Sequence, residues 1–177
     1  MRRLFWPGAA VAVIILLAVA APWLPLPDPV RQDIAQRLSG SMAGSPLGRD
    51  EFGRDVLSRL IWGARASLGV AFAAAGIACI LGTLLGLVGG WVRGIGEFLA
   101  VRSMDIVLCF PPVLLALLVV TLLGPGAGTL ILVLSVLFLP GFVRVTHAEV
   151  QAARSQDYVE AVRALGASPL RILGRTI

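Results

Sequence analysis

Few side chains in this sequence could carry out chemistry on a substrate. All fifteen basic residues are arginine, so neither a phosphate-binding P-loop lysine nor a Schiff-base lysine is possible. The single histidine is His147, and the two cysteines, Cys79 and Cys109, lie far apart in apolar stretches. One histidine and two distant cysteines do not match the ligand spacing of a zinc site or a disulfide framework. We therefore expect no metal site and no cofactor bound by this chain.

The remaining enzymatic alternative is a membrane-anchored enzyme such as an intramembrane protease. A serine protease would need His147 beside a membrane-embedded serine such as Ser135, but His147 follows Arg144 in a polar segment. An aspartyl protease would need paired acidic residues within the membrane, whereas Asp105 is solitary at the end of an apolar stretch. A small structural membrane protein is a third class that composition alone allows.

The overall composition indicates a protein that lies partly in lipid. Of the 177 residues, 58% are hydrophobic and only 14% are charged, which is too little charge to cover a water-exposed surface. The net charge of +5 does not indicate a nucleic-acid partner, because the arginines are dispersed among apolar segments and acidic residues. We expect an all-α integral membrane protein with about four transmembrane helices and the lipid bilayer as a partner.

The first expected crossing runs from Leu4 to Leu24, within a segment 1–26 whose N-terminus carries Arg2 and Arg3. At about 1.5 Å per residue this stretch is just long enough to cross a hydrocarbon core. A cleaved signal peptide is the alternative, because Ala18 and Ala20 form an A-x-A pattern after the apolar stretch.

Segment 27–65 is polar and is predicted to form a loop outside the bilayer. Within it, apolar residues at three- and four-residue intervals predict an amphipathic helix from Asp50 to Ile61. Such a helix could lie along the lipid headgroups or take part in gating.

Segment 66–145 is expected to hold the second to fourth crossings. The second, Ala66 to Val92, ends before Arg93 and carries a small residue at every fourth position, which favours close packing against another helix. These small residues are Ala74, Ala78, Gly82, Gly86 and Gly90. The third and fourth crossings, Ile106 to Leu123 and about Ala127 to Val143, are separated by a glycine- and proline-rich turn and predict an antiparallel hairpin.

Prolines interrupt both arms of this hairpin. Pro111 and Pro112 remove hydrogen bonds in the third crossing, and Pro140 does so in the fourth, so each helix is expected to kink. The kinks would lie at a similar depth and could form a hinge, although prolines also occur in membrane helices for packing reasons alone.

The arginine distribution favours a cytoplasmic N-terminus and tail, with the loop 27–65 external. Nine arginines would then be cytoplasmic and six external. The cytoplasmic set is Arg2, Arg3, Arg93, Arg102, Arg144, Arg154, Arg163, Arg171 and Arg175.

Segment 146–177 is predicted to form a cytoplasmic tail with two short helices. Asp157 and Glu160 have the spacing of a capping box, and Gly166 is suited to end the first helix. Ser168 and Pro169 are suited to begin the second helix. The apolar positions favour an amphipathic pair that could simply rest on the membrane.

The tail sequence YVEAVRALGASPLRILGRTI resembles the EAA loop of ABC importer permeases. The resemblance rests on Glu160, Ala161 and Gly166, and it departs from the family at Val162, where a second alanine is more usual. It implies a coupling site for an ATPase subunit, for which we single out six residues: Tyr158, Glu160, Ala161, Val162, Leu165 and Gly166.

A second stretch, SPLGRDEFGRDVLSRLIWGARASL, is similar to the external motif of the C-type permease subunits of dipeptide, oligopeptide and nickel importers. The segment VRSMDIVLCFPPVLLAL is also similar to that branch. The external motif comprises seven positions: Gly48, Asp50, Gly53, Arg54, Asp55, Gly63 and Arg65.

These resemblances imply a subunit of a type I importer in the cell inner (plasma) membrane. The implied partners are a second homologous permease subunit, two ABC ATPase subunits that bind ATP and Mg, and an extracytoplasmic solute-binding protein. Dipeptides or oligopeptides are the favoured cargo, with a nickel complex or another small solute as alternatives, and no residue is assigned to substrate contact.

The family has six crossings, and its EAA loop normally continues beyond the position of Ile177. We therefore expect the coupling loop to be incomplete at its C-terminal end and the last two crossings to be absent. A fragment, a truncated gene and half of a split gene are all compatible with this expectation.

Overall fold

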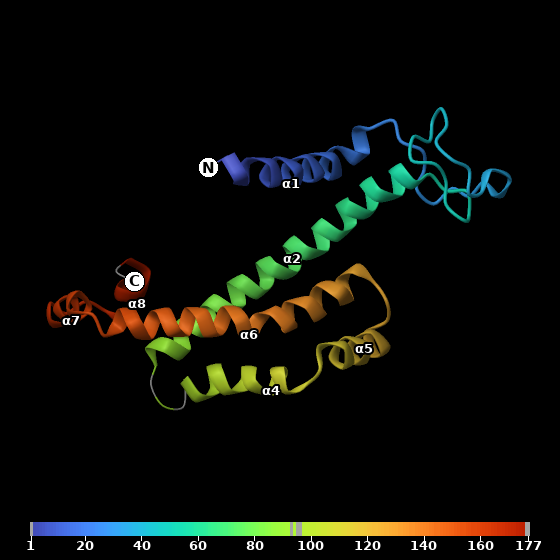
Figure 1. Ribbon diagram of the computed structural model, residues 1–177. Helices are drawn as coiled ribbons and strands as arrows, with labels where there is room; N and C mark the ends of the chain where they lie inside the picture. Colours follow the sequence, from blue (N-terminus) through green and yellow to red (C-terminus); the bar gives the residue numbers. More distant parts are fainter. Residues whose placement is uncertain (1, 93, 95–96, 176–177) are drawn as a thin grey trace. The chain divides into compact units, whose positions relative to one another are not determined.

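The computed structural model describes residues 2–92, 94 and 97–175, without the side chains of residues 2–5, 170, 173 and 175. Helices dominate this described part, and its β-structure is confined to the isolated bridges Met42–Ser45 and Arg49–Asp55 (Figure 1). The chain divides into two compact units, Met1–Gly69 and Val70–Ile177. The all-α membrane fold expected from composition is therefore confirmed.

The first unit contains an apolar helix, a long polar loop and the start of a second helix. Helix α1 spans Arg2–Ala20 and is followed by the short helix η1, Ala21–Trp23. The loop contains one further short helix, η2, Ile34–Gln36. Helix α2, Val56–Trp91, begins in this unit and continues into the next.

The predicted amphipathic helix from Asp50 to Ile61 is wrong at its N-terminal end, because the helix begins at Val56. Asp55 accounts for this boundary, since its Oδ2 accepts a 2.7 Å hydrogen bond from the backbone N–H of Ser58 in the first turn. The amphipathic stretch is also not a separate element, because α2 continues without interruption through the second predicted crossing.

Within the described residues, a π-helix and five α-helices follow α2 in the second unit. The π-helix η3, Phe98–Arg102, leads into α4, Ser103–Cys109, and α5 spans Pro112–Leu123. Helix α6, Ala127–Arg154, contacts both α4 and α5 (Figure 1). The tail contains α7, Asp157–Ala164, and α8, Pro169–Arg175. Arg93, which the sequence places after the second crossing, lies outside the described residues.

The third predicted crossing is divided in two. The segments Phe98–Cys109 and Pro112–Leu123 meet at an angle of 90°, which makes them a broken span or a re-entrant loop. Pro111 precedes α5 in an extended conformation, and Pro112 occupies the first turn, where a missing N–H costs nothing. By contrast, α6 continues past Pro140 and beyond the predicted end at Val143. The proposed hinge at a shared depth stays a prediction.

Three helical stretches within the described residues are long and apolar enough to cross a membrane, and the bent pair would make a fourth. The three are Trp6–Trp23, Val56–Trp91 and Ala127–Arg154. The number agrees with the expected multi-pass arrangement of about four crossings.

The small-residue stripe of α2 packs directly against α6. Ala74 and Ala78 are completely buried, and Ala74 accepts a hydrogen bond from Ser135 on α6. A Cβ added at Gly82 would lie 2.5 Å from Cβ of Phe142, and one added at Gly90 would lie 2.7 Å from Cβ of Val150. The backbones approach so closely that a larger side chain has no room, as the stripe predicted.

Gly86→Ala tests this packing. The new methyl group would lie 2.6 Å from Cβ of Thr146 and 2.8 Å from the carbonyl oxygen of Val143, so we expect the free energy of unfolding to fall by about 1–3 kcal/mol. Thermal unfolding in detergent, followed by circular dichroism, measures the change.

Gly76→Ala is the matched control on the same helix, because no atom lies within 4 Å of a Cβ added there. We expect this variant to be as stable as the wild type or more stable, since alanine favours a helix over glycine by about 1 kcal/mol. Equal Tm values for the two variants would show that the stripe is not tightly packed.

Candidate functional site

The predicted functional residues form two separate groups. The external-motif residues all lie in the first unit, from the loop before α2 into its first turns. The predicted coupling residues lie on α7 and at the bend that follows it, in the second unit.

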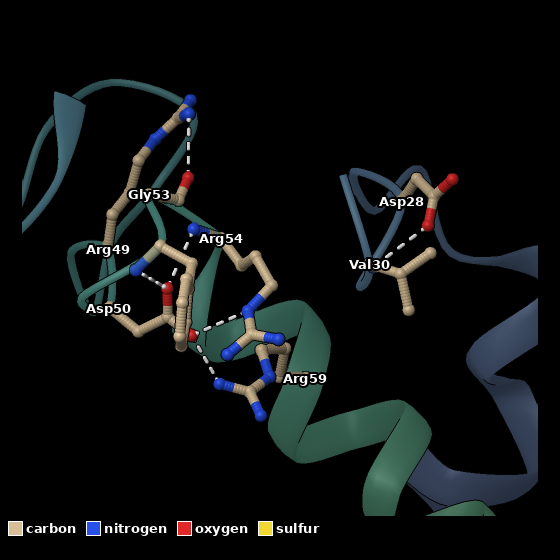
Figure 2. A network of polar contacts seen from close by, with 8 residues as sticks. Asp28, Val30, Arg49, Asp50, Gly53, Arg54 and Arg59 are labelled. Atoms are coloured by element: carbon tan, nitrogen blue, oxygen red, sulfur yellow. Dashed lines mark hydrogen bonds and ion pairs between the residues drawn. The ribbon is translucent and has the colours of Figure 1, made fainter. Parts of the chain in front are cut away.

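Asp50 is the centre of a polar network in the loop (Figure 2). Its Oδ1 accepts hydrogen bonds from the backbone N–H groups of Phe52 and Arg54, each 2.9 Å long. Its Oδ2 accepts a 2.8 Å bond from Nε of Arg54 and is also paired with the guanidinium of Arg59. One carboxylate therefore closes the turn and joins it to the first helical turns of α2.

These contacts change the acidity of Asp50. Desolvation raises its pKa, but the backbone hydrogen bonds from Arg54 and Phe52, together with the Arg54 guanidinium, outweigh this effect and lower the pKa from 3.8 to about 2. The ionised carboxylate is consequently the form that the folded loop stabilises.

Arg49 holds the other side of the same turn. Its guanidinium donates to the carbonyl oxygen of Gly53 at 3.2 Å and pairs with Asp33 at 3.4 Å. Gly53 has a φ of +72° and lies directly against the backbone of Asp33, while Gly48 has a φ of +75° and lies against the carbonyl of Ser39. Both motif glycines thus occupy tight turns that side chains would strain.

The motif residues on α2 have a different environment. Gly63 has open space at its Cα, with no atom within 4 Å of an added Cβ. Arg65 donates to the carbonyl oxygen of Val19 at 3.0 Å, at the C-terminal turn of α1, where helix carbonyls lack intrahelical partners. The motif is therefore not one cluster: Asp50 and Arg54 meet, Asp55 caps α2, and Arg65 caps α1.

Sequence reasoning missed three participants in the loop. Arg49 bonds Gly53 and Arg59 pairs with Asp50, yet neither arginine was included among the motif residues. Ser58 was also not included, although it is fully buried and its Oγ donates to the carbonyl oxygen of Pro27. The polar positions on the first turn of the amphipathic pattern were the available signal for Ser58 and Arg59.

The predicted capping box at the start of α7 does not form. Gln156 is the N-cap residue, with an extended backbone and no side-chain hydrogen bond to the helix, and Asp157 is already the first helical residue. Asp157 and Glu160 both lie in the first turn, where their negative charges are favourable to the helix dipole.

The predicted role of Gly166 as a helix end agrees with the geometry. Its φ is +81°, its N–H donates to the carbonyl of Arg163 at 2.9 Å, and the N–H of Ala167 donates to Val162 at 3.3 Å. These two bonds define a Schellman motif, in which the residue after the helix adopts a left-handed conformation. Helix α8 then begins at Pro169, as expected.

Helix α7 has two distinct faces. Tyr158 is 49% exposed and the Leu165 side chain that follows the helix is 87% exposed, while Glu160 and Ala161 are also exposed. Val159, in contrast, is buried. One face of the helix therefore exposes apolar side chains, and the other packs Val159 against the rest of the unit.

Between α7 and the end of α2 lies a polar hollow of about 580 Å³, lined by Glu97, Gln151, Arg154, Glu160 and Arg163 among others. Two of these wall residues are joined, because Gln151 donates to Glu97 at 3.0 Å. Behind them, His147 lies 3.4 Å from the same carboxylate.

His147 and Ser135 do not form a catalytic pair. Ser135 donates to the carbonyl groups of Ile131 and Ala74, and both residues lie on α6, about 18 Å apart along the helix axis at about 1.5 Å per residue. The described residues also contain no cluster of three His, Cys, Asp or Glu side chains suited to a metal ion.

The Asp50 network predicts an unusual titration. Because the pKa of Asp50 is lowered, the ionised carboxylate stabilises the loop above the ordinary pKa of 3.8, and this contribution is lost as the pH falls through about 2. We expect the amide resonances of Phe52 and Arg54, measured by NMR on the detergent-solubilised protein, to shift with a midpoint near pH 2.

Asp50→Asn should abolish that titration step and loosen the turn, whereas Glu51→Gln, at the neighbouring exposed position, should preserve both. A midpoint near the ordinary value of 3.8 in the wild type would show that the network does not form in solution.

Comparison with known proteins places the chain among transport proteins. Residues 78–177 match the family described as binding-protein-dependent transport system inner membrane component. The match covers α2 from Ala78 onward, the broken third span, α6 and the tail with Gly166.

Individual relatives are similar along nearly the whole chain. The di/tripeptide transport system permease protein DppC of Pseudomonas aeruginosa is 40% identical over 91% of this chain and 55% of its own length. The dipeptide transport system permease protein DppC of Haemophilus influenzae is 33% identical over 92% of this chain and 57% of its own length. The glutathione transport system permease protein GsiD of Pectobacterium atrosepticum is 31% identical over 96% of this chain and 58% of its own length.

The chain therefore spans between half and two thirds of the length of these curated relatives. With the family match over more than half of its residues and the multi-pass helical fold, the chain belongs to the family of binding-protein-dependent transport system inner membrane components.

Proposed function

We propose that this chain is a transmembrane permease subunit of an ATP-driven ABC importer and forms part of the translocation pathway for dipeptides or oligopeptides. The family assignment supports the transporter, and the printed names of the relatives, which are peptide and glutathione permeases, support a peptide cargo. The chain itself performs no chemistry in this proposal.

The observation that carries the proposal is the outward apolar face of the tail. Tyr158 and Leu165 are exposed on one side of α7 and its C-terminal end, and the Schellman bend at Gly166 sets the direction of α8. A short amphipathic helix with exposed anchors suits docking into a groove on a partner. The proposed partner at this face is an ABC ATPase subunit.

The remaining partners follow from the same assignment. A second homologous permease subunit completes the pathway, two ATPase subunits hold ATP and Mg, and an extracytoplasmic solute-binding protein delivers the cargo. The family description supports a binding protein and an inner-membrane location.

In the proposed orientation the N-terminus and the tail are cytoplasmic, and the loop 27–65 is external. The excess of arginines on the tail side supports this topology. It also places the ordered Asp50 turn on the side from which a binding protein would approach.

Gly166 tests the coupling role of the tail. Gly166→Val would force a β-branched side chain into a left-handed conformation at a cost of about 1–2 kcal/mol or more, although no atom lies within 4 Å of its Cβ. In an importer assembled from full-length permease, ATPase subunits and binding protein, we expect lower peptide uptake and weaker ATPase retention, with membrane insertion unchanged.

Gly166→Asn is the matched control, because asparagine tolerates the left-handed conformation and should retain most of the activity. Uptake by Gly166→Val at the wild-type rate would indicate that the tail rests on lipid and does not couple to an ATPase.

The orientation is tested with single cysteines in a background that carries Cys79→Ala and Cys109→Ala. Ser41→Cys in the loop and Ser155→Cys in the tail are both at exposed positions. A membrane-impermeant thiol reagent, added to cells with a permeable outer envelope, should label Ser41→Cys and spare Ser155→Cys. The reverse pattern would overturn the proposed topology.

A further inference from the structure

The inward face of α7 makes a contact that the sequence motifs do not include. The guanidinium carbon of Arg163 lies 5.0 Å from the centre of the Trp91 ring. Trp91 is the last residue of α2, whereas Arg163 lies in the last turn of α7. A guanidinium within about 6 Å of an indole ring is attracted to its negative face, and tryptophan provides the strongest such face.

Trp91 is also tied to α6. Nη1 of Arg154 donates a 2.8 Å hydrogen bond to the carbonyl oxygen of Trp91, and its guanidinium carbon lies 5.7 Å from the same ring. The carbonyls of the last helical turn lack intrahelical partners and carry the negative end of the helix dipole, so an arginine there is favourable. Trp91 therefore joins the ends of α2, α6 and α7 at one point.

A polar hollow borders α7 on this side. The hollow, of about 580 Å³, lies between α7 and the end of α2, and its walls include Glu97, Gln151 and Glu160. Val159 is the fully buried side chain of α7. Displacement passes between elements through atoms in contact, and the hollow provides no such contact between α7 and α2. The contact of Arg163 with Trp91 does provide one.

We infer that Trp91 is a positioning residue that carries movement of the coupling helix α7 to the second membrane helix through its contact with Arg163. The outward face of α7 would receive the partner, and the inward face would pass the movement to α2. The stripe of α2 packs tightly on α6, so a displacement at Trp91 acts on a rigid pair. This inference rests on the proposed function.

The first measurement reports the contact itself and needs no partner. Hydrogen exchange of the α7 amides, in the permease reconstituted in nanodiscs without ATPase subunits, should be roughly five-fold faster in Trp91→Leu and in Arg163→Gln, because either change removes one side of the cation–π pair. Trp91→Phe and Arg163→Lys retain weaker versions of the pair and should lie between these variants and the wild type. The controls are Trp23→Leu and Arg171→Gln, both at exposed positions outside the contact.

The second measurement reports transmission. In the assembled importer we expect Trp91→Leu and Arg163→Gln each to reduce the number of peptides taken up per ATP hydrolysed, while ATP hydrolysis and ATPase retention stay near wild type. The double variant should be no worse than either single variant, since both remove the same link. Rescue by Arg163→Lys would show that the cation, and not the bulk of the side chain, is required.

The outcomes separate the inference from the proposed function. Faster exchange with an unchanged transport ratio would refute transmission through Trp91 and leave the importer function intact. Exchange at the wild-type rate in both variants would show that the contact does not hold α7. A wild-type assembly that takes up no peptide would refute the proposed function, and this inference with it.

Discussion

Close approach between α2 and α6 is the constraint on which the second unit depends. In lipid, apolar side chains gain nothing by leaving one apolar surface for another, so helices associate through close packing and hydrogen bonds. The buried Ala74 and Ala78 and the glycines that follow bring the two backbones together, and the bond from Ser135 to Ala74 adds to this contact. With α6 placed, Arg144 reaches Asp105 at 2.7 Å and Arg154 reaches the end of α2.

The first unit is ordered by polar contacts instead. Its loop buries few large apolar side chains, and Phe52 remains 44% exposed. Order in this loop comes instead from the carboxylates of Asp50 and Asp55, which accept hydrogen bonds from backbone N–H groups at the turn and at the start of α2. Charge-assisted hydrogen bonds are stronger than neutral ones, so these two carboxylates stabilise the turn and the start of α2.

The tail combines a bend fixed by hydrogen bonds with a helix, α7, that borders a polar hollow. Gly166 and its two hydrogen bonds determine where α7 ends and α8 begins. Helix α7 borders the polar hollow, buries Val159 and contacts Trp91 through Arg163. Such an arrangement suits the coupling role proposed for α7.

Local features of this protein could be predicted from its sequence because they depend on neighbouring residues. The long apolar stretches, the break at Gly124, the close-packing stripe and the helix end at Gly166 each follow from composition or spacing within a few residues. The bend in the third crossing was predicted from Pro111 and Pro112, and the structure adds its angle of 90°. The start of α2 at Val56 and the uninterrupted α6 around Pro140 needed the tertiary structure. So did the joining of Trp91 to Arg154 and Arg163, which are far from it in sequence. Periodicity predicts which residues share a face of one helix, but only the folded chain decides which side chains from distant segments come close enough to bind.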